Sequence, residues 1–236
     1  MSKNQSQIDE PIFEAFENMA CEYKKSMSQF RPCKIGGEMS ESNLVFTFLR
    51  EFLKNKPDAI YAVEVPFANI KDDKDTPTNI DGDSWTKHLD ALIYHDQVLY
   101  LIEAKRDYPA KTYFELIEKD LKRIKSQALA FSLNRMINRD DDPKVEHKAY
   151  DKPIQTSEIK AVKGILLADT WRELNVKVWE EGKRDNAPFN WLQPLHRKTK
   201  SLGFQAKNPK APYTLLIAQT ENLSDSLKII KKGIQI

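Results

Sequence analysis

Apolar residues recur every three or four positions in two long stretches of the chain, which is the period of an amphipathic helix. The first stretch follows Ser40, a typical helix N-cap residue, and runs to about residue 55. The second runs from about Thr112 to Met136 and is expected to form one long helix. A further helix, rich in acid at its start, is predicted over residues 9–29.

Short apolar runs rich in β-branched and aromatic residues predict strands. The expected strands are 59–67, 87–94, 98–105, Val162–Ala168 and Tyr213–Ala218. The second and third are expected to form a hairpin with its turn at 95–97, and a short helix is expected after each of the last two. The segment 181–211 is predicted to be irregular. This order predicts an α/β fold, in which a mixed central β-sheet is flanked by helices.

Composition narrows the classes of function. Lys and Arg number 37 and Asp and Glu number 35, so a net charge of +2 argues against a histone-like polycation but permits a local basic face. Two cysteines and four histidines argue against a disulfide framework and structural zinc. The chain has no GxGxxG, GxxxxGK[ST], GxSxG or HExxH motif, so the common nucleotide-binding, serine-hydrolase and zinc-protease classes lack support. With no signal region and no run of membrane length, a soluble cytoplasmic protein without a membrane partner is expected.

The most informative stretch is HLDALIYHDQVLYLIEAKRD, residues 88–107. Both predicted strands in it are apolar on both faces, so both are expected to be central and covered on each side. Asp90, Glu103 and Lys105 then lie at the ends of buried strands. A turn centred on Asp96 would place Asp90 opposite position 102, one residue from Glu103. Two carboxylates and one ammonium group are therefore predicted to converge.

Burying these charges costs several kcal/mol each unless a partner compensates them. A divalent cation is a natural partner, and carboxylate oxygens suit Mg²⁺, which also keeps several waters. The alternative is purely structural. Glu103 and Lys105 would then form an i,i+2 pair, and Asp90 would be an ordinary strand-end residue near Lys87.

Glu41 supplies a third carboxylate from the preceding helix. It lies four, seven and eleven residues before Val45, Phe48 and Phe52, in line with the buried stripe. As an acid in the first turn it also complements the helix dipole, and the two roles are compatible. The weaker candidates for this place in the site are Glu38 and Glu51.

These residues resemble the PD-(D/E)xK nuclease superfamily, with its restriction-endonuclease-like fold. The resemblance covers residues 40–131 and rests on Glu41, Asp90 and Glu103-Ala104-Lys105. It implies a core of helix, three strands, helix and strand. Leu89 stands where the nominal motif has proline, a position that varies widely in the superfamily.

The resemblance also implies roles for these residues. Asp90 and Glu103 would bind Mg²⁺, with Mn²⁺ able to substitute, and Ala104 would lend its backbone carbonyl. Lys105 would position or deprotonate the attacking water, and Glu41 would complete the site.

Two residues of the predicted long helix extend the hypothesis. Gln127 lies beside the buried stripe, one turn from Ile124 and Phe131, and Arg123 lies four residues earlier. Either side chain is a candidate contact for the substrate phosphate, as in some members of the superfamily. In the alternative, Gln127 only forms a hydrogen bond with Arg123.

Residues 182–213 form a basic and aromatic region, which contains seven basic residues and one acidic residue, Asp185. Phosphate contacts are expected from Arg197, Lys198 and Lys200, and base stacking from the interleaved aromatic residues. In the alternative, this region is a solvated segment whose aromatic side chains pack on the core or on a second subunit. The basic residues are Lys183, Arg184, Arg197, Lys198, Lys200, Lys207 and Lys210, and the aromatic residues are Phe189, Trp191, Phe204 and Tyr213.

The sequence therefore predicts an N-terminal helix and loop over 1–39, followed by a nuclease-like domain over 40–236. The expected function is Mg²⁺-dependent phosphodiester hydrolysis, with DNA favoured because most relatives with this core act on DNA. The alternative is a non-cleaving nucleic-acid-binding or structural subunit of a larger defence or mobile-element complex. A homodimer or a separate motor or targeting subunit is a further expected partner.

Overall fold

A mixed sheet flanked by helices forms the centre of the protein, as the sequence predicts, and it has six strands where the sequence predicts five. The computed structural model describes residues 7–29, 40–67, 87–107, 110–138, 154–184, 187–205 and 212–232. In spatial order the strands are β1 (Ile60–Phe67), β2 (Lys87–His95), β3 (Val98–Lys105), β4 (Ala161–Thr170), β8 (Pro212–Gln219) and β7 (His196–Gln205). Only β3 and β4 pair in parallel; the other neighbours are antiparallel.

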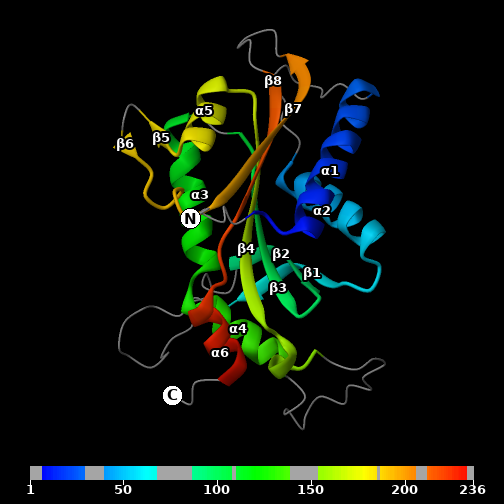
Figure 1. Cartoon of the computed structure of the whole chain (residues 1–236), viewed down its shortest axis with the longest axis vertical. Helices are drawn as coiled ribbons and strands as arrows, with labels where there is room; N and C mark the ends of the chain where they lie inside the picture. The colour runs from blue at the N-terminus through cyan, green and yellow to red at the C-terminus, as the bar shows by residue number, and fades with distance from the viewer. Residues whose placement is uncertain are drawn as a thin grey trace, which may run out of the picture.

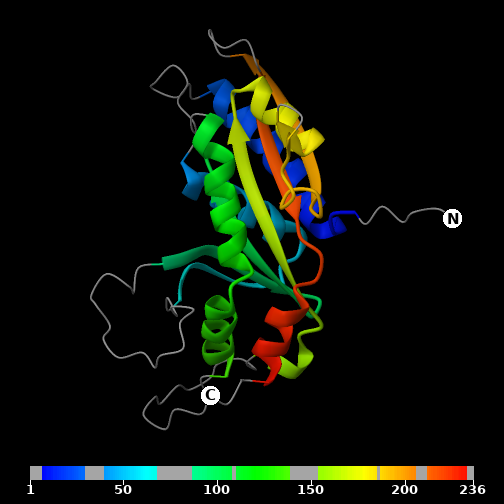
Figure 2. The same ribbon diagram turned by 90° about the vertical axis from the view of Figure 1, so that its left-hand side faces the viewer.

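Helices cover both faces of this sheet (Figures 1 and 2). On one face lie α1 (Glu10–Gln29) and α2 (Glu41–Asn55). The other face carries α3 (Ala110–Ile124), α4 (Gln127–Ile137), α5 (Glu173–Glu181) and α6 (Ser224–Lys232). Two short elements complete the described chain: a 3₁₀ turn at Thr156–Glu158, and the hairpin of β5 (Lys183–Arg184) with β6 (Ala187–Pro188).

Strand β3 is buried because each of its faces contributes to a different apolar core. Leu99 and Leu101 pack in the core beneath α3 and α4, whereas Tyr100 and Ile102 pack in the core beneath α1 and α2. This explains the unbroken apolar run in the sequence, since a strand covered on both sides has no polar face. Glu103 continues the α3-facing set, so its carboxylate enters the core beside that helix.

The hairpin between β2 and β3 differs by one residue from the prediction. His95 pairs with Val98, and both intervening residues, Asp96 and Gln97, have positive φ angles of 48° and 66°, as in a type I′ turn. The next pairs lead to Ala91 opposite Ile102. One further step along this register places Asp90 opposite Glu103, so the predicted pairing with position 102 is wrong.

The predicted single helix over 112–136 is also wrong, because it is divided into α3 and α4. Ser126 caps α4: its hydroxyl accepts a hydrogen bond from the Leu129 N–H at 3.2 Å. A serine side chain that bonds the backbone competes with helix continuation. Gln127 therefore begins a new helix and is solvent-exposed.

The segment predicted to be irregular, 181–211, contains the ten-residue strand β7. It pairs along much of its length with β8 at the edge of the sheet. Its sequence, HRKTKSLGFQ, lacks the apolar alternation of a half-buried strand. Because main-chain pairing at the edge of a sheet requires no such alternation, the hydrophobic pattern did not predict strand β7.

The N-terminal helix belongs to the same core as the rest of the protein. Phe16 and Met19 of α1 are fully buried against α2 and the sheet. Just before α1, the Asp9 carboxylate accepts hydrogen bonds from Lys163 at 2.7 Å and from the Tyr100 hydroxyl at 2.9 Å. In the described part of the chain, no helix is both long and apolar enough to cross a membrane.

Candidate active site

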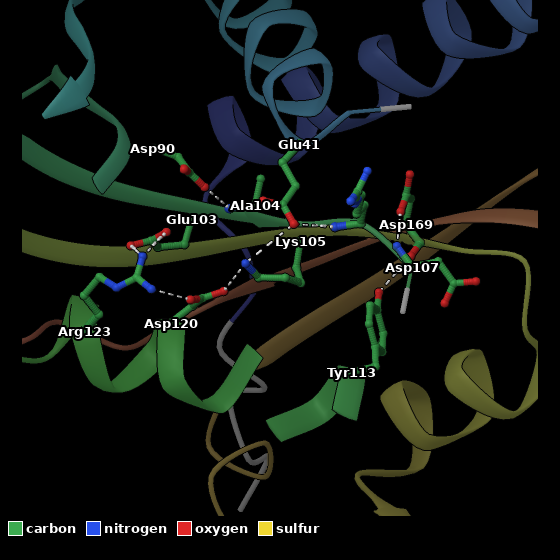
Figure 3. Close-up of polar contacts among 11 residues, drawn as sticks. Glu41, Asp90, Glu103, Ala104, Lys105, Asp107, Tyr113, Asp120, Arg123 and Asp169 are labelled. Carbon is green, nitrogen blue, oxygen red and sulfur yellow. Dashed lines mark hydrogen bonds and ion pairs between the residues drawn. The ribbon is translucent and has the colours of Figure 1, made fainter. Parts of the chain in front are cut away.

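Four carboxylates and two cations gather around the carboxyl end of β3 (Figure 3). We call Glu41, Asp90, Glu103 and Asp120 the carboxylate cluster. Asp90 comes from β2, Glu103 and Lys105 come from β3, Glu41 comes from the first residue of α2, and Asp120 and Arg123 come from α3. The structure therefore brings together all four residues that the sequence predicted as catalytic.

Asp90 bonds to the backbone of the neighbouring strand. Its Oδ2 accepts a hydrogen bond from the Ala104 N–H at 2.7 Å. Burial raises the pKa of Asp90, and the charge of Glu41 adds to that rise, while the Ala104 N–H opposes it. The carboxylate is thereby fixed beside the Glu103-Ala104-Lys105 motif.

Glu103 is the most deeply buried member of the cluster, with 2% of its surface exposed. Arg123 Nη1 donates to both carboxylate oxygens of Glu103, at 2.9 and 3.1 Å. Burial and the nearby charge of Asp90 nevertheless raise the pKa of Glu103 to about 9. One guanidinium thus compensates this concentration of negative charge only in part.

Lys105 is held between two carboxylates from opposite sides of the sheet. Its Nζ lies 3.1 Å from Asp120 Oδ2 and 3.6 Å from Glu41 Oε1. Burial acts to lower the pKa of Lys105, but the charges of Asp120 and Glu41 outweigh it, so the pKa is raised. The ammonium group is therefore protonated at neutral pH.

Glu41 combines the two roles that the sequence allowed. The Ser40 hydroxyl caps α2 by accepting from the Asn43 N–H at 3.2 Å, which places Glu41 in the first turn of the helix. Its Oε1 also accepts from the Arg106 N–H at 3.3 Å, just beyond β3. A carboxylate at the positive end of the helix dipole thus reaches the site.

Asp120 was not assigned a role from the sequence. It is 3% exposed; its Oδ1 accepts from Arg123 Nη2 at 2.8 Å, while its Oδ2 lies 3.1 Å from Lys105 Nζ. Burial raises its pKa despite both cations. The sequence carries a signal for it, because Asp120 lies at helical spacing between the buried Ile117 and Ile124.

Gln127 and the three basic residues of β7 lie apart from this cluster. Gln127 is exposed on α4, and Arg123 bonds to Glu103 and Asp120 instead. On β7 the side chains alternate between faces. Arg197 donates to the Trp179 carbonyl, Lys200 pairs with Glu17 of α1, and Lys198 is exposed between them.

The aromatic residues of the basic region that are described pack against the core, as in the alternative interpretation. Phe189 stacks on Phe114 with ring centroids 5.4 Å apart, and Trp191 contacts Phe189 edge-on at 6.1 Å. Tyr213 is fully buried. These rings therefore contribute to the packing of the core, and Phe189 and Trp191 remain partly exposed. Lys207 and Lys210 lie outside the described residues.

A second buried polar network fixes the chain just after Lys105 (Figure 3). Asp169, at the end of β4, accepts from the Asp107 N–H at 2.8 Å and from the Tyr213 hydroxyl. Tyr113 of α3 donates to the Asp169 carbonyl at 2.8 Å, and Asn175 of α5 donates to Asp107 at 3.1 Å. This network ties the ends of β3 and β4 to the helices that follow them. In the sequence, this network is indicated by an acidic residue close to the end of two apolar runs, Asp107 after β3 and Asp169 in β4.

The donor chemistry of the cluster fits a hard divalent cation. Asp90 and Glu103 are neighbouring oxygen donors, and the pKa of each is raised chiefly by burial and further by nearby negative charge. Among the described residues, no group of three or more His, Cys, Asp or Glu side chains is placed so that it could hold a metal ion. Glu51 is engaged elsewhere by Arg50 and Lys54, and Glu38 lies outside the described residues.

No protein-family model matches this chain, and no curated protein or solved structure matches it either.

Proposed function

We propose that the protein is a metal-dependent nuclease that hydrolyses phosphodiester bonds, with DNA as the favoured substrate. The observation that carries this proposal is the convergence of Asp90, Glu103 and Lys105 at the end of β3, with Glu41 and Asp120 on either side. Two hard-oxygen ligands beside a protonated amine suit the binding of a divalent cation and a phosphate.

The topology supports a restriction-endonuclease-like core as part of this proposal. The core that the resemblance implies runs helix, three strands, helix and strand. Here β1, β2 and β3 form an antiparallel meander, α3 and α4 follow, and β4 is parallel to β3. The preceding helix, α2, supplies Glu41.

The residues of the site have distinct roles in this proposal. Asp90, Glu103 and the Ala104 carbonyl would hold Mg²⁺ or Mn²⁺, and Glu41 would contribute a carboxylate at the solvent side. A bound metal would lower the pKa of its water and offset charge on the phosphate. Lys105 would donate hydrogen bonds to the attacking water or to a phosphate oxygen.

A cleavage assay tests the proposal directly. Supercoiled plasmid and linear single- and double-stranded DNA would be incubated with Mg²⁺, Mn²⁺ or EDTA. We expect cleavage with either metal, none with EDTA, and a loss of at least about 100-fold in Lys105→Ala, as for removal of a positioned acid-base or electrostatic group.

Metal binding separates the roles of the individual residues. Asp90→Ala and Glu103→Ala should each lose both metal binding and cleavage. Lys105→Ala should lose cleavage while keeping metal binding, as measured by calorimetry with Mn²⁺. Loss of metal binding in the Lys105 variant would contradict the role given to this residue.

One observation favours a second candidate function, a non-cleaving nucleic-acid-binding or structural subunit. Arg123 occupies both oxygens of Glu103, so the site is partly neutralised without a metal. DNA binding that weakens with salt, combined with no cleavage under any metal condition, would favour this function. A homodimer or a separate motor or targeting subunit would then be sought as the partner that supplies catalysis or specificity.

A further inference from the structure

Arg123, a long side chain that is partly exposed, contacts the deeply buried carboxylate of Glu103. A single guanidinium nitrogen, Nη1, lies within hydrogen-bond distance of both Glu103 oxygens, at 2.9 and 3.1 Å. Those are the oxygens through which Glu103 would bind a metal. The arginine side chain is 30% exposed and the glutamate side chain is 2% exposed, so the arginine has access to solvent and the glutamate does not.

Arg123 also has a second acidic partner, on its own helix. Its Nη2 donates to Asp120 Oδ1 at 2.8 Å, three residues earlier on α3. Figure 3 shows the guanidinium bonded to Glu103 through one nitrogen and to Asp120 through the other. The contact with Asp120 is therefore made by a different nitrogen from the contact with Glu103.

We propose that Arg123 occupies the cation position of the site when no metal is bound, and that a divalent metal must displace it from Glu103. The displaced guanidinium, still anchored to Asp120, then faces solvent beside the metal and can donate a pair of hydrogen bonds to a substrate phosphate. This inference rests on the proposed function, and it adds that Arg123 sets the affinity of the site for metal.

Electrostatics gives the sign of the effect. A guanidinium close to Glu103 repels a divalent ion about twice as strongly as it repels a proton, because Coulomb energy scales with charge. Removing Arg123 therefore makes metal binding more favourable, both relative to protonation of Glu103 and relative to the site with no cation bound. Arg123→Met keeps much of the apolar length of the side chain and removes the charge.

Calorimetric titration of the full chain with Mn²⁺ tests the proposal. We expect Arg123→Met to bind the metal about tenfold more tightly than the unmodified protein, a plausible result of losing one close like charge. Lys122→Met is the matched control. It removes one positive charge from the same helix, where Lys122 pairs with Glu118 on the surface, and it should leave the affinity unchanged.

Each outcome separates the two proposals. Equal or weaker binding by Arg123→Met would overturn the displacement and leave the metal-dependent function standing. If neither the unmodified protein nor Arg123→Met binds Mn²⁺, both the displacement and the metal-dependent function are overturned. Tighter binding by both Arg123→Met and Lys122→Met would also overturn the role of Arg123, because net charge would explain it.

A second measurement follows metal binding in the unmodified protein and uses a conservative variant only for assignment. In protein labelled with ¹⁵N-arginine, the side-chain signals of Arg123 would be assigned by their absence in Arg123→Lys and followed during titration with Mg²⁺. We expect the Arg123 signals to shift with metal occupancy, while the Arg135 signals stay in place. Metal binding measured by calorimetry without a shift of Arg123 would overturn the proposal.

Discussion

At the scale of single residues, the site is defined by acids in places where apolar side chains normally lie. Glu103 and Asp120 are almost fully buried, and burial is the main cause of the raised pKa of each. An acid in such a position lowers stability when it is ionised, unless a cation compensates it. In the described structure Arg123 and Lys105 supply that compensation.

The raised pKa of Glu103 predicts how stability depends on pH without metal. Its ordinary value is 4.5 and its folded value is about 9, so the folded protein retains a proton that the unfolded chain has released. Stability should therefore fall as pH rises from about 5 to about 9. Melting temperatures measured in EDTA should show this fall, and Glu103→Gln should reduce its slope.

Glu51→Gln is the control for this experiment. Glu51 is also buried, but its ion pairs with Lys54 and Arg50 outweigh the effect of burial and lower its pKa. Its contribution to stability is therefore lost only at acid pH, and removing it should not change the slope over the same range. An unchanged slope in Glu103→Gln would contradict the assignment.

Asp120 should matter for catalysis although it is not a metal ligand in the proposed function. Asp120→Asn removes the charge that holds the Lys105 ammonium at 3.1 Å, and so misplaces the group that orients water. We expect kcat to fall about 10- to 100-fold, with Mn²⁺ affinity much less affected. Single-turnover cleavage assays would measure this.

Glu118→Gln is the matched control, because Glu118 lies on the same helix and pairs with the exposed Lys122 at 2.7 Å, away from Lys105. It should retain full activity. Full activity in Asp120→Asn would show that Asp120 has no role in catalysis.

At the scale of elements, α3 must lie close to the sheet for Asp120 and Arg123 to reach β3. Gly164 of β4 permits this approach: a Cβ there would lie 2.7 Å from Ile124 Cγ2, at the end of α3, and 3.1 Å from Thr220 Cγ2. Real Cβ atoms do not come so close, so the helix end or its side chain would have to move.

Gly164→Ala should therefore destabilise the protein by about 1–3 kcal/mol, as expected for overpacking in a core. Urea denaturation would measure the change. In an Ile124→Ala background the same substitution should cost less, because the clashing methyl group is absent. Additive effects of the two substitutions would show that the close approach is not the cause.

At the scale of the whole molecule, two apolar cores on opposite faces hold the sheet, and α1 forms a large part of one of them. The α1 residues buried there are Ile12, Ala15, Phe16, Met19, Ala20, Tyr23 and Met27. Asp9 further anchors this end of the chain to β3 and β4 through Tyr100 and Lys163. Residues 1–39 are therefore not expected to be dispensable for folding.

A shortened chain of residues 40–236 should consequently fail to fold cooperatively. Removing α1 would expose Phe48, Phe52 and the face of the sheet beneath them to water. Urea denaturation followed by circular dichroism should show no sharp transition. A milder variant, Phe16→Ala in the full chain, should lose about 3–5 kcal/mol. A cooperative transition in the shortened chain would show that 40–236 is an independent unit.

Much of the fold followed from the sequence alone, because periodicity reports local burial. The amphipathic stripe of α2, the cap at Ser40 and the apolar run of β3 were all predicted from residues close together in the chain. The same reasoning placed Asp90, Glu103, Lys105 and Glu41 at the ends of buried elements.

Tertiary structure decided what local patterns do not encode. The positive φ angles of Asp96 and Gln97 set the register that aligns Asp90 with Glu103. Pairing with β8 made a strand of β7, and packing of α3 against the sheet brought Asp120 to Lys105. Both depend on contacts between residues far apart in the chain, and a local pattern of polar and apolar positions carries no record of those partners.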